Sequence, residues 1–263
     1  MKKALYRVQG NNIQLKNLMA RGVGFMVHGK RLIKKMAFDF LPSSTVLMFH
    51  HIDDGNIIVR SGCRLSKKSF VDILDSGISF ISAEEYTQFV FSWKNPCLIT
   101  FDDGLKDVYR VAYPELKKRN IPFTVFIVTD FLDQEGYLSS KELQVLADDP
   151  LVTIGSHGTT HKILHGMDEA EQRMELLDSK HILEEKTGKS VWLFAYSHGQ
   201  FDDTTLRILQ TEKCYDYAFA AGGGETNWIT KKTNFTLPRL NMEEDLQNYR
   251  IYGSSHCRLK QLL

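Results

Sequence analysis

The sequence lacks the features that mark several classes of protein. Only four of its 263 residues are cysteine, no two of them are close together, and no Cys-x-x-Cys pair occurs. This spacing argues against a disulfide framework and against a cysteine zinc site. No apolar run approaches the roughly 18 residues of a membrane span, and no run of about 7–15 apolar residues follows Met1-Lys2-Lys3 as in a secretion signal. We therefore expect a cytoplasmic protein, or one bound peripherally at the inner face of the membrane.

The net charge is also small, but it is unevenly distributed. The whole chain carries +1, whereas residues 1–40 hold nine lysines and arginines against Asp39 alone, a net +8 that leaves −7 for the remainder. A basic arm on an acidic body could contact anionic lipid or a polyanionic partner. The alternative is a solvated or partly disordered leader. Nucleic acid is not an expected partner, because the body is net negative and no base-stacking motif occurs.

A change of pattern near Pro42-Ser43-Ser44 divides the chain into a basic N-terminal extension (1–42) and a larger domain (43–263). In the larger domain, short apolar runs alternate with amphipathic segments. Strands that are apolar on both faces and separated by helices indicate a parallel sheet covered by helices, an α/β fold. Eight such runs favour an irregular (β/α) barrel over an open sheet. The runs are 45–50, 78–82, 97–101, 123–128, 152–156, 191–196, 217–221 and 235–240.

Two of the intervening helices have recognisable signals in the sequence. Ser66 is a suitable N-cap for a helix that follows it. A second helix is expected to run through Met174, Leu177 and His181 and to end at Gly188, because glycine is the usual residue just past a helix C-terminus.

Titratable residues collect at the ends of the predicted strands. Reactive residues of (β/α) barrels gather at the C-terminal ends of the strands, which form one face of the barrel. Five candidates occupy such positions: Asp102 and Asp103 after CLITF, His157 after VTIGS, His198 after VWLFAY, and His50 at the end of TVLMFH.

The segment GSHGTTH (155–161) places His157 and His161 four residues apart, so that two imidazoles can converge on one ion. Two histidines with one carboxylate leave positions open for water and substrate, and Asp102 or Asp103 can supply the carboxylate. Successive residues at a strand end point in different directions. One aspartate can therefore bind the cation while the other acts as a general base on water. The alternative is an Asp-Gly turn in which an aspartate caps a helix over 105–119.

These segments resemble the motifs of the polysaccharide deacetylase family. TFDDG (100–104) followed by SHGTTH (156–161) is similar to the first two motifs of that family, whose catalytic part is the NodB homology domain. The resemblance extends over roughly residues 45–242. Three further segments resemble the subgroup that acts on poly-N-acetylglucosamine: LMFHHI (47–52), FAYSHG (194–199) and LPRL (237–240).

The resemblance implies a metal-dependent hydrolase that removes N-acetyl groups from a GlcNAc-type sugar or polysaccharide in surface polysaccharide synthesis. It assigns Asp102 as the general base and Asp103, His157 and His161 as ligands of a divalent metal, usually zinc; cobalt, nickel or iron would suit the same ligands. It also implies an irregular (β/α) barrel, in agreement with the strand pattern. The partner would be an N-acetylated sugar, a polysaccharide or a lipid-linked precursor.

Two motifs depart from the commonest pattern of the family. The third lacks the usual arginine and prolines. In our interpretation Arg239 orients Asp102 instead, unless it is only structural, and the backbone N–H of His198 holds the oxyanion in the place of the family's tyrosine. The final motif lacks its histidine, which leaves the general acid unassigned. His50 is our candidate, ahead of His51 and His198.

Two alternatives stay open at this point. The same site could serve a deformylase or another hydrolase of non-peptide C–N bonds, and a comparison of acetylated with formylated sugars separates these activities. The chain could also be a catalytically inactive relative that binds carbohydrate. In that case Asp102→Asn would change no activity.

Overall fold

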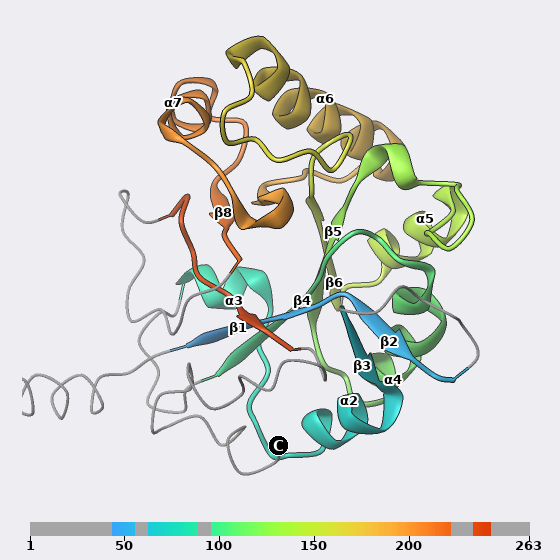
Figure 1. Cartoon of the computed structure of the whole chain (residues 1–263). Coiled ribbons are helices and arrows are strands. Elements are labelled where there is room, and N and C mark those ends of the chain that lie inside the picture. The colour runs from blue at the N-terminus through green and yellow to red at the C-terminus, as the bar shows by residue number, and fades with distance from the viewer. Residues whose placement is uncertain (1–43, 56–62, 89–95, 222–233, 243–263) are drawn as a thin grey trace, which may run out of the picture. The chain divides into compact units, whose positions relative to one another are not determined.

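The computed structural model describes residues 44–55, 63–88, 96–221 and 234–242 (Figure 1). The basic extension predicted for residues 1–42 lies outside them, and the division of the chain at residue 42 stays a prediction. The elements are, in chain order, β1 (Thr45–Phe49), β2 (His51–Asp53), β3 (Arg64–Ser66), α2 (Lys67–Leu74), α3 (Ala83–Gln88), β4 (Cys97–Phe101), η1 (Val108–Ala112), α4 (Tyr113–Lys118), β5 (Phe123–Ile127), η2 (Thr129–Phe131), α5 (Ser140–Asp148), β6 (Val152–Ser156), α6 (Glu169–Thr187), β7 (Leu193–Ala195), η3 (Ser197–Gly199), α7 (Asp203–Glu212), β8 (Tyr217–Phe219) and β9 (Leu240–Asn241).

The main sheet is a parallel one that curls into an irregular (β/α) barrel, as the sequence predicts. Within the described residues it has seven strands in the order β8-β7-β6-β5-β4-β1-β9. The last segment contacts both edges of the sheet: Leu237 forms a parallel bridge with Phe219 of β8, and β9 pairs with Leu47 and Met48 of β1. Figure 1 shows β9, in red, alongside β1. Residues 237–241 therefore close the barrel.

The strands are apolar on both faces because both faces are covered. Every residue of β1, β4 and β5 is buried, as expected for a parallel sheet between two layers. Alternate residues then point to opposite sides. One set packs against the surrounding helices in the larger core cluster, and the other fills the barrel. The filling set is Val46, Ala83, Tyr86, Leu98, Phe126, Leu193, Ala195, Phe219 and Leu237, with Ala83 and Tyr86 contributed by α3.

One predicted strand, residues 78–82, is wrong. Only Phe80 forms a bridge there, to Cys97 at the start of β4. From Ile99 onward β5 occupies that side of β4, so no edge is left for a longer pairing. Ser82 and Glu85 then exchange side-chain to backbone hydrogen bonds that begin α3. A short parallel pair, β2 with β3, was not predicted; it lies outside the barrel sheet.

The two helix signals are confirmed, although two of the residues named for the second helix lie on its exposed side. Ser66 caps α2 by accepting a hydrogen bond from the Ser69 N–H, and α6 ends at Gly188 in the left-handed conformation. Met174, however, is 60% exposed, and His181 is exposed as well. The buried side of α6 is largely polar: Gln172, Glu175, Leu176, Ser179, Leu183 and Thr187.

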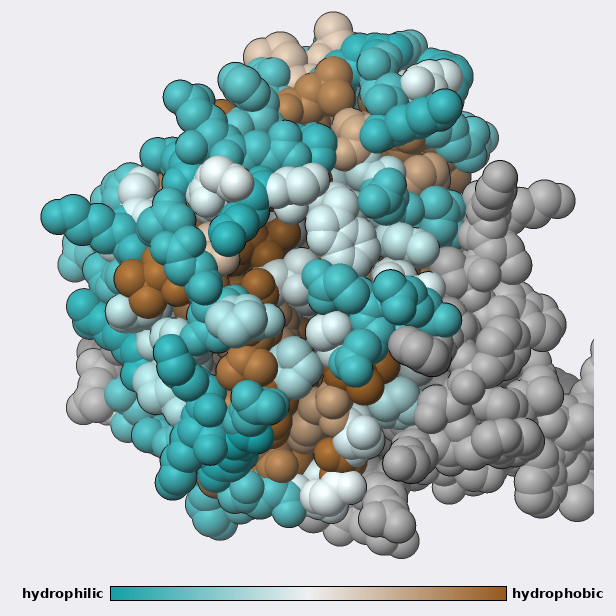
Figure 2. Space-filling model, turned by 180° about the vertical axis from the view of Figure 1, so that it is seen from behind, coloured by the Kyte–Doolittle hydropathy of each residue, from teal (hydrophilic) through white to brown (hydrophobic). Residues whose placement is uncertain are grey.

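Hydrophilic side chains dominate the described surface on the side opposite to the view of Figure 1, and hydrophobic residues show there only in separate patches (Figure 2). This is the pattern of helices that turn one face to a core and the other to water. Among the helices that the structure describes, none is both long enough and apolar enough to cross a membrane.

The closing segment gives a direct test of the barrel. Leu237 is fully buried in the inner cluster, so Leu237→Ala should lower the free energy of unfolding by about 2–5 kcal/mol, through lost burial and the cavity that remains. Val145, which is 45% exposed on α5, provides the control. Val145→Ala should change the free energy of unfolding by no more than about 0.5 kcal/mol. Urea unfolding of both variants measures the difference. Equal stabilities would contradict closure by this segment.

Candidate functional site

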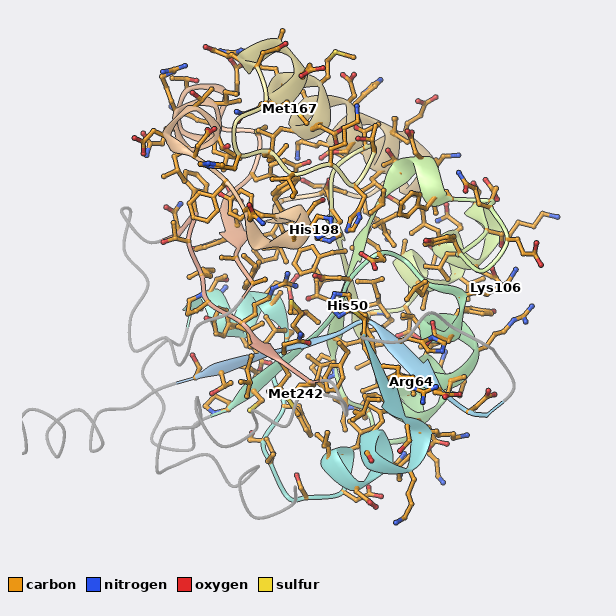
Figure 3. The ribbon with its side chains drawn as sticks, in the orientation of Figure 1. His50, Arg64, Lys106, Met167, His198 and Met242 are labelled. Atoms are coloured by element: carbon orange, nitrogen blue, oxygen red, sulfur yellow. The ribbon has the colours of Figure 1, made fainter. Side chains whose placement is uncertain are left out.

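The strand ends bring the predicted site residues together at one end of the barrel. Asp102 follows β4, His157 follows β6, and their side chains come within 3.7 Å of each other. His198 lies in the turn η3 after β7, and its ring centroid is 4.7 Å from that of His161. His50, at the end of β1, is close enough to influence the pKa values of both aspartates and of His198. Figure 3 shows His50 and His198 near the centre of the view.

Asp102 is held by a buried arginine. Nη1 of Arg239 donates to Oδ1 at 2.6 Å, and Nη2 donates to Oδ2 at 2.7 Å, which makes a bidentate pair. Arg239 is fully buried and Asp102 is 2% exposed. Two further contacts fix the guanidinium: Nε donates to the Ala220 carbonyl at 3.1 Å, and the group lies over the Phe126 ring. The predicted partnership of these residues is thus present in the geometry.

The ion pair determines the protonation of Asp102. Burial alone would raise the pKa of this carboxyl, but the Arg239 guanidinium outweighs burial and holds the pKa well below its usual range, with His157 adding to the effect. Asp102 is therefore ionised at every pH at which the protein would work. Its two oxygens are oriented by Arg239 rather than free to rotate.

Asp103 points to the two histidines instead. Its Oδ1 lies 3.5 Å from Nε2 of His157 and 3.2 Å from Nε2 of His161. This oxygen is buried and accepts no hydrogen bond of ordinary geometry. Within the described residues these three are the group of histidines and carboxylates whose ligand atoms could hold one metal ion, all within 4.8 Å of one another. The two neighbouring aspartates thus have separate partners, and neither side chain caps a helix.

The histidines are prepared to accept a cation. Nδ1 of His157 lies 2.7 Å from the Ala195 carbonyl at the end of β7. Since that carbonyl can only accept, Nδ1 carries the proton and Nε2 keeps its lone pair toward Asp103. Burial lowers the pKa of His157, which favours the neutral form. Burial would also lower the pKa of His161, but Asp103 outweighs it and the pKa is raised.

The geometry of Asp103, His157 and His161 fits a divalent cation. Ligand atoms about 2.1 Å from one ion lie roughly 3.0–3.4 Å apart at octahedral or tetrahedral angles, close to the 3.2 and 3.5 Å found here. The buried oxygen without an ordinary hydrogen bond faces two imidazole nitrogens, an arrangement that a cation would stabilise. Two histidines and one carboxylate suit zinc and several other first-row metals.

Backbone strain is concentrated at this site. Asp103, His161 and His198 all have left-handed backbone conformations, with φ of 69°, 65° and 56°. Such a conformation costs of order 1–2 kcal/mol for a residue with a Cβ. The surrounding hydrogen bonds maintain it, and it turns these three side chains or peptide groups toward one point.

Glu175 is a site residue that the sequence pattern did not reveal. It reaches from the buried side of α6 to the loop between the two histidines, where it accepts hydrogen bonds from the N–H groups of Thr159 (2.7 Å) and Thr160 (3.0 Å) and from the Thr160 hydroxyl. A Cβ at Gly158 would lie 2.8 Å from its Oε2. Glu175 thereby sets the spacing of His157 and His161. The sequence offers no signal for it, since α6 holds several other acidic residues.

His51, the second candidate for the general acid, has a different partner. Its Nδ1 lies 2.7 Å from Oδ2 of Asp107, and both side chains are buried. The same oxygen accepts the Ile52 N–H. The hydrogen bond and charge of Asp107 raise the pKa of His51 against the opposing effect of burial. His51 therefore anchors β2 to the segment after β4, whereas His50, its neighbour, remains at the site.

The comparisons with known proteins agree with this geometry. Residues 93–215, which include both aspartates and both histidines, match the sequence model described as "Polysaccharide deacetylase". This segment of the chain is therefore similar to a polysaccharide deacetylase domain. The chain is 29% identical over 173 residues to YxkH of Bacillus subtilis, whose name provisionally assigns that protein to the same family, and the match covers 63% of this chain and 60% of that protein.

A second relative is a poly-β-1,6-N-acetyl-D-glucosamine N-deacetylase of Staphylococcus aureus, 28% identical over 186 residues, with 63% of this chain and 62% of the relative covered. The chain thus spans about three fifths of the length of these relatives. The structure of the deacetylase PplD of Streptococcus pyogenes aligns with a TM-score of 0.68 at 23% identity, covering 78% of this chain and 94% of PplD. That likeness confirms the predicted barrel fold.

The His51–Asp107 pair predicts a pH-dependent contribution to stability. Because the folded-state pKa of His51 is raised, the pair stabilises the fold fully below the unfolded-state pKa of about 6.5, and this stabilisation is lost as pH rises through the folded-state value. The difference in unfolding free energy between wild type and His51→Gln should therefore shrink between pH 5.5 and 8.5 in urea titrations. His181→Gln, on the exposed side of α6, is the control. A difference that does not depend on pH would contradict the charged pair.

The role of Glu175 can be tested through cation binding. In Glu175→Ala the N–H groups of Thr159 and Thr160 lose the carboxylate oxygen that accepts both of them, so the two histidines should lose their spacing. We expect Zn²⁺ and Co²⁺ affinity to fall about 10- to 100-fold, the usual effect of losing a group that orients ligands. Competition with a chromophoric chelator measures the affinity. Glu185→Ala, an exposed change on the same helix, should leave the affinity unchanged; equal affinities in all three proteins would contradict the assignment.

Proposed function

We propose that the chain is a metal-dependent hydrolase that removes N-acetyl groups from a sugar polymer or oligomer of the N-acetylglucosamine type. The observation that carries the proposal is the separation of two neighbouring aspartates, Asp102 with Arg239 and Asp103 with His157 and His161. A structural Asp-Gly turn would not need that division. A general base beside a cation site is what hydrolysis of an amide requires.

Asp102 is the proposed general base. Its Oδ2, 3.7 Å from Nε2 of His157, lies at the border between the ion pair and the three proposed ligands. The carboxylate accepts a proton from the attacking water, and Arg239 keeps it ionised and in a single orientation. The lowered pKa makes Asp102 a weak base on its own. This chemistry therefore requires a water that is more acidic than bulk water.

Asp103, His157 and His161 are the proposed cation ligands, with zinc as the expected ion. A bound divalent cation would polarise the acetyl carbonyl and make a water more acidic. The Ala195 carbonyl holds His157, and Glu175 holds the loop that carries His161.

His50 and His198 complete the proposed reaction. Breaking the amide bond releases acetate and a sugar amine, and the leaving nitrogen needs a proton. His50, at the end of β1, is close enough to influence the pKa of both aspartates and is the proposed donor. The left-handed turn at His198 lies beside the His161 ring, and its backbone N–H is the proposed support for the developing oxyanion.

The substrate class follows the family and the relatives. The description of the matching family names polysaccharide as the substrate, and the name of the Staphylococcus relative gives poly-β-1,6-N-acetyl-D-glucosamine. We propose a polymer of this type or a lipid-linked precursor in surface polysaccharide synthesis. Contact with a membrane through the basic segment 1–42 stays a prediction, since that segment lies outside the described residues.

Metal content and acetate release test the function together. Wild type incubated with Zn²⁺ should contain about one ion per chain and release acetate from β-1,6-linked N-acetylglucosamine oligomers. Asp103→Ala and His157→Ala should lose the ion. Asp102→Asn should keep it but lose activity about 10²- to 10⁴-fold, the usual contribution of a general base. Asp178→Asn, an exposed change on α6, is the matched control.

Two results would overturn this function. A wild type that binds no divalent cation in excess zinc would leave only the fold in common with the family. An Asp102→Asn variant as active as wild type would remove the general base. Faster release of formate from N-formyl sugars than of acetate from N-acetyl sugars would identify the activity as deformylation instead of deacetylation.

A further inference from the structure

Two aromatic side chains beside the site belong to neither hydrophobic core cluster. Phe131 and Tyr137 are partly exposed, whereas the largest fully buried side chains include seven phenylalanines of the barrel and its covering layer. Neither ring is among the partly buried side chains that pack against those clusters. A Phe and a Tyr that leave apolar surface in water without serving the core suggest a role in binding.

These rings continue a row that begins at the proposed cation ligands. The centroid of Phe131 is 4.6 Å from that of Tyr137 and 5.8 Å from that of His161. His161 in turn lies 4.7 Å from His198. The row Tyr137–Phe131–His161–His198 therefore leads from the rim of the site to the point where the acetyl group would be cleaved.

The backbone holds the two rings firmly against both site motifs. Leu138 N–H donates to the Gly104 carbonyl (2.9 Å), and Lys106 N–H donates to the Gly136 carbonyl (2.9 Å), which fixes the Tyr137 end to the turn after the two aspartates. At the other end, the N–H of Asp130 donates to the Thr159 carbonyl (3.0 Å) in the loop between the two histidines. Segment 129–138 thus bridges the two parts of the site.

We propose that Phe131 and Tyr137 form a subsite for a pyranose ring of the polymer next to the sugar that is deacetylated. The inference rests on the proposed function and extends it to substrate length. A pyranose offers an apolar C–H face that packs on an aromatic ring and hydroxyls at its edge that need polar partners. Phe131 supplies the apolar face alone, and Tyr137 supplies a face and a hydroxyl.

The charge around Tyr137 is consistent with a hydrogen-bond donor. Burial and the nearby charge of Asp103 raise the pKa of its phenol, so the hydroxyl stays protonated. The subsite thus places an apolar surface and one donor beside a catalytic centre rich in anions and imidazoles. It would favour a chain of neutral N-acetylated sugars over a single acetylated sugar.

Chain-length dependence tests the subsite in the metal-loaded protein. Tyr137→Ala and Phe131→Leu should each raise KM for a β-1,6-linked N-acetylglucosamine tetramer about five- to tenfold, the scale of one aromatic contact, with a smaller effect on kcat. The change for the monosaccharide N-acetylglucosamine should be smaller than for the tetramer. Tyr137→Phe keeps the ring and should recover most of the affinity. Binding of the tetramer to Asp102→Asn, measured by calorimetry, provides a readout without turnover.

A matched control lies at the opposite end of the barrel. Trp192, just before β7, and Tyr217, at the start of β8, form another partly exposed aromatic pair, with centroids 6.0 Å apart. Tyr217→Ala should leave KM for both substrates unchanged. Zinc content and unfolding midpoint of every variant show whether a change arises from lost folding or lost metal.

The outcomes separate this inference from the proposed function. If wild type deacetylates the tetramer while Tyr137→Ala and Phe131→Leu keep its KM, the function stands and the subsite is wrong. The subsite is equally wrong if Phe131→Leu raises KM for the monosaccharide and the tetramer by the same factor. If wild type releases no acetate from any sugar and does not bind the tetramer, both are overturned. A selective loss of tetramer binding at full zinc content supports the subsite.

Discussion

The buried ion pair between Arg239 and Asp102 is the interaction on which the rest of the site depends. It joins residues 137 positions apart, one on the segment that closes the barrel and one at the end of β4. Two charges removed from water carry a desolvation cost that only good geometry offsets. Here the two terminal guanidinium nitrogens donate to the two carboxylate oxygens, and Nε donates to the Ala220 carbonyl. Nη1 also lies 3.4 Å from the Thr100 hydroxyl. Closing the barrel and orienting Asp102 are therefore the same structural event.

The position of the pair follows from the alternation of the strands. The side of β4 that faces the barrel interior carries Leu98, Thr100 and Asp102. On the closing segment, the side that faces the interior carries Leu237 and Arg239. The interior is thus apolar at one end and ionic at the other, where Phe126 still underlies the guanidinium. Asp103, one residue on, must point elsewhere, and its left-handed backbone turns it to the histidines. The contrast between two adjacent aspartates is a consequence of strand geometry.

Sequence reasoning recovered the parts of the structure that local patterns encode. The apolar runs gave seven strands of the barrel, and the two motifs gave the group Asp103, His157 and His161. It did not recover the parts that tertiary contacts decide. Residues 78–82 have strand-like composition but meet a strand that already has neighbours. The inward face of α6 is polar because Glu175 and Ser179 form hydrogen bonds with groups from distant segments. The spacing of apolar residues along a helix does not reveal such partners.

The same reasoning explains why the site is built on loops that are nevertheless rigid. The segments after β4, β5 and β6 exchange backbone hydrogen bonds with one another: Leu138 with Gly104, and Asp130 with Thr159. Glu175 adds a contact from the helical layer to the last of them. Each loop can therefore carry a left-handed residue at a cost of order 1–2 kcal/mol, because its neighbours exclude the relaxed alternatives. Positioning of the two aspartates, the two histidines and the rim aromatics is in this way a property of the loops acting together, and a change in one loop would be felt at the others.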